Sequence, residues 1–213
     1  MKNLFAISIA VAALSACGNK PVQPDWKFNA SGSLKAYSDA YLKGDTSVAE
    51  TDFARARHEM ASTGRPDLVA HAQLYRCATR TASMEFDACP AFQALAQDAT
   101  AVERTYAAYL DGQWQGIDSA LLPEQHRAIV QATAPIASIA DPLSRLVAAG
   151  VLMRTGRITP ADIVVATDTA SAQGWRRPLL MWLGVSLKRA QGAGDSAEAA
   201  RIERRIAIAA ASK

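Results

Sequence analysis

The chain has 213 residues, of which half are hydrophobic and 7% aromatic, and its formal net charge is +3. A charge this small argues against nucleic-acid binding, and the length fits one domain with a substantial core. Many hydrophobic residues are alanine, which favours helix over sheet. Residues 175–213 carry eight basic and three acidic side chains. This basic region could face acidic lipid headgroups or an acidic partner; a solvated helix face is the plainer interpretation.

The first 17 residues have the layout of a secretory signal peptide. Lys2 precedes an apolar stretch over residues 4–14, which is too short to span a bilayer comfortably. The stretch ends in Leu14-Ser15-Ala16-Cys17, which resembles the lipobox of bacterial lipoproteins. The resemblance implies removal of residues 1–16, acylation of the Cys17 thiol, and a membrane-anchored protein on the periplasmic side. An ordinary signal peptide with an incidental cysteine is the alternative.

Gly18 and Asn19 follow the cysteine. In lipoproteins of enteric-type bacteria, aspartate at the first of these positions favours the inner membrane, so the resemblance implies the outer membrane here. Residues 17–31 contain proline, glycine and serine without an apolar period, and they predict a flexible tether after the lipid. Trp26 and Phe28 are expected to dock on the domain, or to dip into the lipid interface.

From Leu34 onward the hydrophobic pattern is helical, and no segment alternates with a period of two. Residues 32–213 are therefore predicted to form a single all-α domain of about nine helices. Glycines mark helix ends, and capping residues or prolines mark helix starts, as at Gly44-Asp45 and Thr159-Pro160. Short loops predict antiparallel helical hairpins, which either stack into a solenoid or wrap into a compact array.

Two segments resemble tetratricopeptide repeats. In the first, Gly44 separates two helical patterns, and Ala49, Phe53 and Ala56 follow at the spacing of the second repeat helix. The second begins at Trp182-Leu183-Gly184, and it departs from the pattern because no aromatic residue follows at the expected position. The resemblance implies a TPR-like arrangement of right-angled hairpins, with a concave face that binds a peptide or protein.

Two cysteines, Cys77 and Cys89, remain after Cys17. An even pair in an exported domain predicts a disulfide, worth about 3 kcal/mol in the chain-entropy description. Two free thiols or a metal pair are the alternatives, but a metal site needs more ligands at close spacing than this segment offers. The sequence predicts neither a metal site nor a cofactor.

Motifs of catalysis are missing from the sequence. His58-Glu59 lacks the second histidine of a zinc protease helix, and neither a Gly-x-Ser-x-Gly elbow nor a phosphate-binding glycine loop occurs. Asp67 and His71 lie four residues apart and are expected to make a surface hydrogen bond. Glu85 and Asp87 are expected to be solvated. We therefore predict no catalytic residue and expect the protein not to be an enzyme.

The aromatic residues are the better candidates for a binding surface. Five tyrosines stand at helical spacing and are expected mostly in the core: Tyr37, Tyr41, Tyr75, Tyr106 and Tyr109. Trp114, in a glycine-flanked break, and Trp175, beside Arg176 and Arg177, are expected to be exposed. Exposed tryptophan and arginine are typical of binding hot spots, so these four residues are the predicted partner contacts.

The leading hypothesis is a lipid-anchored periplasmic adaptor or assembly factor that binds an envelope protein or peptide. An envelope enzyme acting on peptidoglycan, or its accessory, is one alternative; a small-molecule-binding lipoprotein is another. An open concave groove lined by tyrosine, tryptophan and arginine would favour the adaptor. A cleft with converging carboxylates and histidine would favour the enzyme, and a closed apolar cavity would favour the small-molecule binder.

Overall fold

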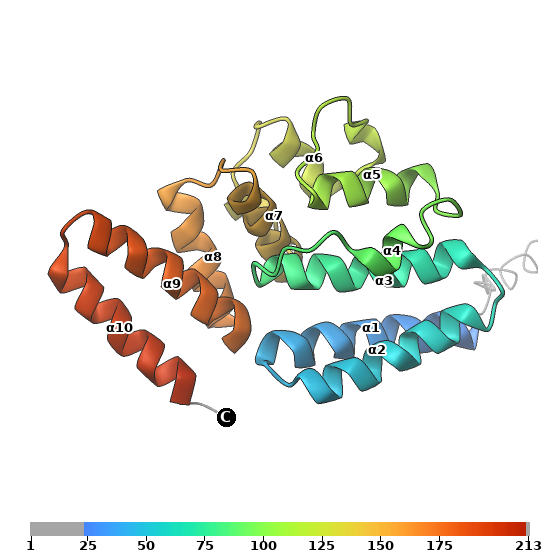
Figure 1. The fold of residues 1–213 in the computed structure, drawn as a ribbon, viewed down its shortest axis with the longest axis horizontal. Helices are drawn as coiled ribbons and strands as arrows, with labels where there is room; N and C mark the ends of the chain where they lie inside the picture. The colour runs from blue at the N-terminus through green and yellow to red at the C-terminus, as the bar shows by residue number, and fades with distance from the viewer. Residues whose placement is uncertain (1–23, 212–213) are drawn as a thin grey trace, which may run out of the picture.

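The structure is a computed structural model and describes residues 24–211. Within that range it has ten α-helices, two short 3-10 helices and no strand (Figure 1). The elements are α1 (Asp25–Lys43), α2 (Thr46–Ala61), α3 (Pro66–Ala82), α4 (Pro90–Gln93), α5 (Ala101–Leu110), η1 (Ser119–Leu121), α6 (Glu124–Val130), η2 (Ile136–Ser138), α7 (Pro142–Arg154), α8 (Pro160–Ala172), α9 (Arg176–Gly192) and α10 (Ser196–Ala211). All but α4 have seven residues or more, so the predicted all-α class with about nine helices is confirmed.

Helix boundaries follow local capping chemistry. Asp45 Oδ1 accepts a hydrogen bond from Val48 N at 3.1 Å, which satisfies a free amide at the start of α2. Gly44 ends α1 with a φ of 99°, a left-handed conformation that residues with a Cβ rarely adopt. Thr159 and Asp162 form a reciprocal capping box at the start of α8. These predicted helix ends are therefore confirmed.

The tether predicted over residues 17–31 is wrong from Asp25 onward, because α1 begins there. Ala30 is buried in the core, and Asn29 Nδ2 donates to Glu59 Oε1 across the α1–α2 pair at 3.3 Å. Packing against α2 thus outweighs the weak helix propensity of the Ser-Gly-Ser segment. Phe28 does not dock, since 75% of its surface is exposed. The lipobox and residues 17–23 of the predicted tether lie outside the described residues.

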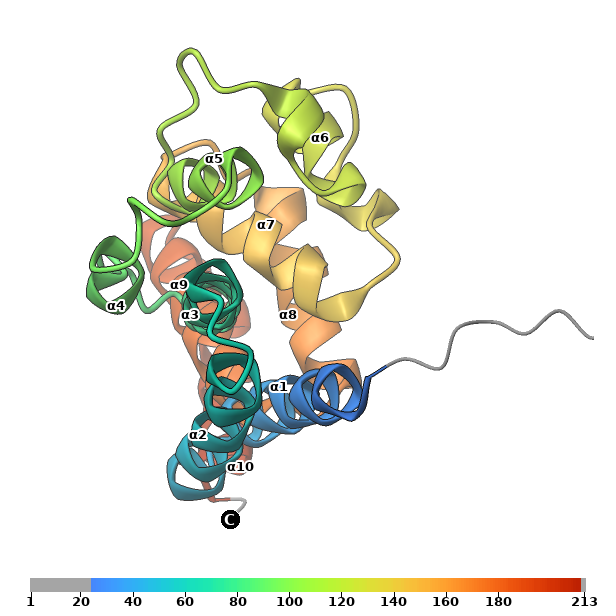
Figure 2. The same cartoon turned by 90° about the vertical axis from the view of Figure 1, so that its right-hand side faces the viewer.

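Helices α3 and α7 occupy the centre of the array (Figures 1 and 2). The α1–α2 hairpin packs on one side of α3, while α5 and α7 pack on others, and α8 connects this core to the α9–α10 hairpin. Gly150 of α7 faces the backbone of Thr81, where a Cβ would collide with the carbonyl group. The two central helices can approach this closely because position 150 has no side chain. None of the described helices has the length and apolarity required to cross a membrane.

Candidate functional site

A pocket of about 480 Å³ opens between α3, α5, α6 and α7, with Lys35 of α1 at its edge. Figure 2 shows how these four helices lie relative to one another. Its volume falls within the range of small-molecule sites. The apolar wall consists of Leu74, Ala78, Val102, Pro123, Leu143 and Val147, and three rings complete it: Tyr75, Tyr106 and His126. We call this cavity the His126 pocket.

His126 lies on the short helix α6 and is 1% exposed. Its Nδ1 atom lies 3.1 Å from the hydroxyl of Tyr109, and the two ring centroids are 4.9 Å apart. Burial lowers the pKa of His126 to about 4, and the carboxylate of Asp141 opposes this shift only in part. The imidazole is therefore neutral at physiological pH.

A stack of rings holds His126 in place. Tyr109 stacks on Tyr106 at a centroid distance of 5.9 Å and on Trp114 at 6.0 Å. Trp114 Nε1 donates to the Tyr109 carbonyl oxygen at 3.3 Å, and the guanidinium of Arg157 lies 4.6 Å from the Trp114 ring centroid. Trp114, predicted as an exposed partner contact, is instead half-buried behind the ring that orients His126.

Polar side chains surround the apolar wall: Lys35, His71, Glu103, Gln125, Asp141 and Ser144. Glu103 Oε2 accepts hydrogen bonds from Thr100 N and Thr100 Oγ1 at 2.7 and 2.9 Å, and its Oε1 lies 4.0 Å from His71 Nδ1. Asp141 Oδ2 caps α7 by accepting from Ser144 N at 2.7 Å. Both carboxylates of the pocket therefore already hold helix N-termini.

The predicted bond between Asp67 and His71 does not form. Asp67 instead forms a bidentate ion pair with Arg65. This arginine holds the pKa of Asp67 below its usual range. His71 lies toward Glu103, on the rim of the His126 pocket. The spacing of four residues places Asp67 and His71 on the same side of α3. Contacts with other segments nevertheless determine which side chains pair with each other.

The prediction that Trp175 is exposed is wrong. Trp175 is 8% exposed, and its Nε1 donates to Asp39 Oδ1 at 3.4 Å. Arg177 donates to the Tyr41 carbonyl oxygen at 2.8 Å and to Thr46 Oγ1 at 2.7 Å. These bonds fasten the start of α9 to the α1–α2 turn. Trp175 and Arg177 thus make contacts within the chain, with residues 131 to 136 positions away in sequence.

Arg176 is half-buried against the same turn. A Cβ at Gly44 would lie 2.7 Å from its Nη2 atom, so the glycine leaves room for the guanidinium.

The tyrosines largely follow the prediction. Tyr37, Tyr41 and Tyr109 are buried, whereas Tyr75 and Tyr106 are partly buried and line the pocket.

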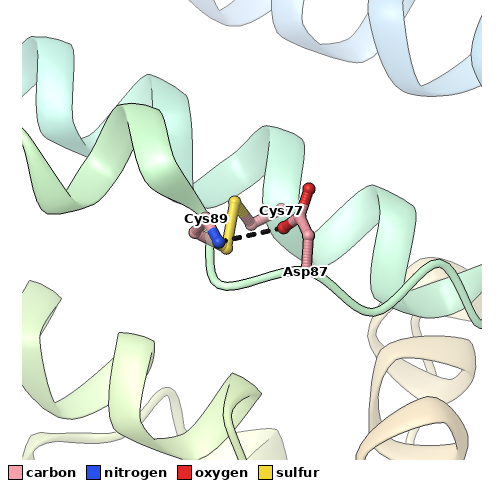
Figure 3. A group of neighbouring side chains, drawn as sticks. All are labelled: Cys77, Asp87 and Cys89. Carbon is pink, nitrogen blue, oxygen red and sulfur yellow. Dashed lines mark hydrogen bonds between the residues drawn. A yellow bond between two sulfur atoms is a disulfide. The ribbon is translucent and has the colours of Figure 1, made fainter.

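Cys77 and Cys89 are joined as predicted, with their Cα atoms 5.9 Å apart (Figure 3). Cys89 N donates to Asp87 Oδ1 at 2.9 Å, and Asp87 Oδ2 pairs with Arg80 Nη1 at 2.7 Å. Ligand atoms of Cys77, Asp87 and Cys89 lie within 4.8 Å of one another, a spacing that suits a metal ion. The sulfurs, however, are bonded to each other and the carboxylate is held by Arg80.

Glu85 and Asp87, predicted to be solvated, are paired with arginines. Glu85 Oε1 lies 3.4 Å from Arg177 Nη1, and Glu85 Oε2 lies 3.6 Å from Arg80 Nε. Through these ion pairs, Glu85 connects the loop closed by the disulfide both with α3 and with the start of α9.

Sequence reasoning missed His126 and the cavity around it. Its sequence signal is a histidine two residues before the apolar run Ala128-Ile129-Val130, and nothing in that pattern indicates Tyr109 as its partner. The chain matches no family model, no curated protein and no solved structure.

Proposed function

We propose that the protein is a non-catalytic lipoprotein of the bacterial envelope that binds a small, largely apolar molecule in the His126 pocket. One observation carries the proposal. The cavity has apolar walls, and His126 and Tyr106 line it, yet His126 Nε2 and the Tyr106 hydroxyl have no hydrogen-bond partner within residues 24–211. Buried polar groups are normally satisfied, so atoms of this kind at a pocket wall point to a ligand that satisfies them.

The proposed location depends on the lipobox resemblance at Cys17. Seven residues separate Cys17 from the first residue of α1. Fully extended, they span at most about 25 Å, so a lipid on Cys17 would hold the helical domain close to the membrane surface. Replacing Cys17 with serine should abolish labelling by a radioactive fatty acid and release the protein from membranes. Continued lipid labelling of this variant would contradict the proposed anchor.

An enzymatic function has less support. The His126 pocket does bring Glu103, Asp141, His71 and His126 together, which is the kind of cluster that an envelope hydrolase would need. Glu103 and Asp141, however, accept hydrogen bonds from helix N-termini, and the neutral His126 is bonded to Tyr109. Glu103, Asp141 and His126 thus have structural roles, and the non-enzymatic hypothesis therefore remains our proposal.

The adaptor hypothesis is the second candidate, and a separate cleft favours it. This cleft, about 910 Å³ in volume, lies between the α1–α2 turn and the α8–α9 turn. Its walls carry charges of both signs, including Asp39, Lys43 and Asp52, as a peptide-binding surface often does. Photocrosslinkers placed at Asp52 and, as a control, at Arg204 of α10 would test it in cells. Reproducible capture of one envelope protein from Asp52 alone would support the adaptor.

Ligand binding can be tested with N-phenyl-1-naphthylamine, an uncharged probe whose fluorescence rises in apolar surroundings. We expect saturable binding to the mature protein carrying Cys17→Ser, which has no lipid to absorb the probe. Two exposed valines provide a matched pair of variants. Val102 lines the pocket and is 49% exposed, whereas Val164 lies on α8 and is 58% exposed.

Val102→Trp should weaken probe binding by obstructing the pocket, while Val164→Trp should leave it unchanged. Both positions are exposed, so neither change should disturb the core, and thermal melts would check this. Ala78→Phe, which fills the pocket from α3, provides a second obstruction. An absence of saturable binding, or equal binding by all variants, would refute the proposed function.

A further inference from the structure

The tautomer of His126 follows from its neighbour. The Tyr109 side chain is fully buried, and His126 Nδ1 is the only hydrogen-bond partner of its hydroxyl among the described residues. If Nδ1 carried the proton, the hydroxyl proton of Tyr109 would be buried without an acceptor, which is costly. Tyr109 therefore donates to Nδ1, and the neutral imidazole carries its proton on Nε2.

His126 lines the pocket, and its Nε2–H is the ring group that has no partner among the described residues. Several polar atoms of the core are fully enclosed and have no partner, among them Tyr37 Oη and Trp182 Nε1. His126 Nε2 and Tyr106 Oη also lack a partner, but they are not among these enclosed atoms. Both residues line the cavity, so a molecule inside it can reach both groups. The remaining phenol of the pocket, Tyr75, already shares a hydrogen bond with Ser38 at 3.0 Å.

The pocket thus presents two donors at an otherwise apolar wall. Asp141 and Glu103 are the negatively charged side chains of the pocket, and Lys35 is the positively charged one. His71 lies at the rim. The carboxylates disfavour an anion, and His126 supplies no positive charge because burial keeps it neutral. The ammonium of Lys35 and the two donors disfavour a cation. An uncharged group that accepts hydrogen bonds fits these surroundings best.

We propose that the ligand of the His126 pocket is an uncharged apolar molecule bearing a carbonyl oxygen, which accepts hydrogen bonds from His126 Nε2–H and the Tyr106 hydroxyl. This inference rests on the proposed function, and it adds the chemical class of the ligand. The pocket takes the carbonyl end of a ketone, ester or amide, while its aromatic and aliphatic walls contact the apolar body.

Two naphthalenes of nearly equal shape test this inference: 2-acetylnaphthalene, which has a carbonyl group, and 2-isopropenylnaphthalene, which has a methylene in its place. Each would be titrated against N-phenyl-1-naphthylamine bound to the mature protein carrying Cys17→Ser. A purely apolar pocket prefers the alkene, because it is less well solvated by water. We expect the ketone to bind about fivefold to tenfold more tightly, the effect of one net hydrogen bond.

Two tyrosine variants form a matched pair for the same titration. Tyr106→Phe removes the free hydroxyl and should reduce the preference for the ketone, whereas Tyr37→Phe removes an enclosed core hydroxyl that lies outside the pocket and should not. The anion 2-naphthoate should bind more weakly than the ketone.

The ¹⁵N chemical shifts of the His126 ring, assigned by comparison with a His126→Gln variant, should show that the proton is on Nε2.

The possible outcomes separate the two proposals. If neither naphthalene displaces the probe and the probe itself does not bind, the proposed function fails. If both bind but the alkene is preferred, or if 2-naphthoate binds best, the function stands and the carbonyl inference is overturned. A proton on Nδ1 of His126 would also overturn it, because the pocket would then present an acceptor.

Discussion

Replacing Gly150 with alanine should destabilise the protein, although alanine is the better helix former. A Cβ at this position of α7 would lie 3.0 Å from the carbonyl carbon and Cγ2 of Thr81, and closer still to its carbonyl oxygen. That oxygen also accepts a hydrogen bond from Met84 N at 2.9 Å, which limits how far it can move. Helices α3 and α7 must therefore separate to admit one methyl group.

Overpacking of a core costs about 1–3 kcal/mol, and alanine recovers about 1 kcal/mol of helix propensity. Because the contact is with backbone, the cost should lie at the upper end, which leaves a net loss of about 2 kcal/mol. For a domain of this size that corresponds to a fall in melting temperature of roughly 4–8 °C. Urea unfolding followed by circular dichroism at 222 nm would measure the change.

Gly184 provides the matched control. It lies inside α9, and a Cβ there would meet nothing within 4 Å. Gly184→Ala should therefore stabilise the protein by about 0.5–1 kcal/mol, the ordinary propensity gain. Gly150→Ala should also weaken probe binding, since α3 and α7 both line the His126 pocket. If both alanine variants were equally stabilised, the close approach of α3 and α7 would be refuted.

Three further predictions concern stability. The pKa of His126 is about 4 in the folded state, below its unfolded value of about 6.5, so the unfolded state binds a proton that the folded state does not. The free energy of unfolding should therefore be highest above pH 6.5. It should fall by about 2 kcal/mol between pH 7 and pH 5. Urea titrations should show this slope in the wild type and not in His126→Gln; equal slopes would contradict it. Reducing the Cys77–Cys89 disulfide should lower the free energy of unfolding by about 3 kcal/mol. Thiol counting on unreduced mature protein should find neither cysteine free, and two reactive thiols would refute the bridge. Arg177→Ala should lower the free energy of unfolding by about 2 kcal/mol, because it removes hydrogen bonds to Tyr41 and Thr46, whereas Arg204→Ala on α10 should cost almost nothing. Equal unfolding midpoints for these two variants would show that the contact of α9 with the α1–α2 turn contributes little.

Helix positions could be predicted because their signals are local. The side chain of Asp45 reaches an amide three residues later, and Gly44 needs only its own backbone freedom. The disulfide was predictable for a similar reason, since the two cysteines are only 12 residues apart and the sequence indicated export. The error at the start of α1 arose because residues 25–31 have the composition of a linker, yet Ala30 is buried within the array.

The candidate site could not be predicted, because it depends on contacts between distant segments. His126 is buried by helices that are widely separated in sequence, and its partner Tyr109 comes from α5. The same holds for Trp175 and Arg177. Their positions beside one another indicated an exposed hot spot, but the α1–α2 turn covers them. Residue type marked these side chains as important without indicating which surface they would face.

Nuclear Overhauser effects between a bound probe and the pocket rings would observe occupancy of the His126 pocket directly. With 2-acetylnaphthalene and isotope-labelled mature protein carrying Cys17→Ser, we predict contacts from the naphthalene protons to the rings of Tyr75 and Tyr106 and to the methyl groups of Leu74. The acetyl methyl group should lie near His126. Contacts confined to residues outside the pocket, or none at a saturating probe concentration, would contradict ligand binding by this protein at the His126 pocket.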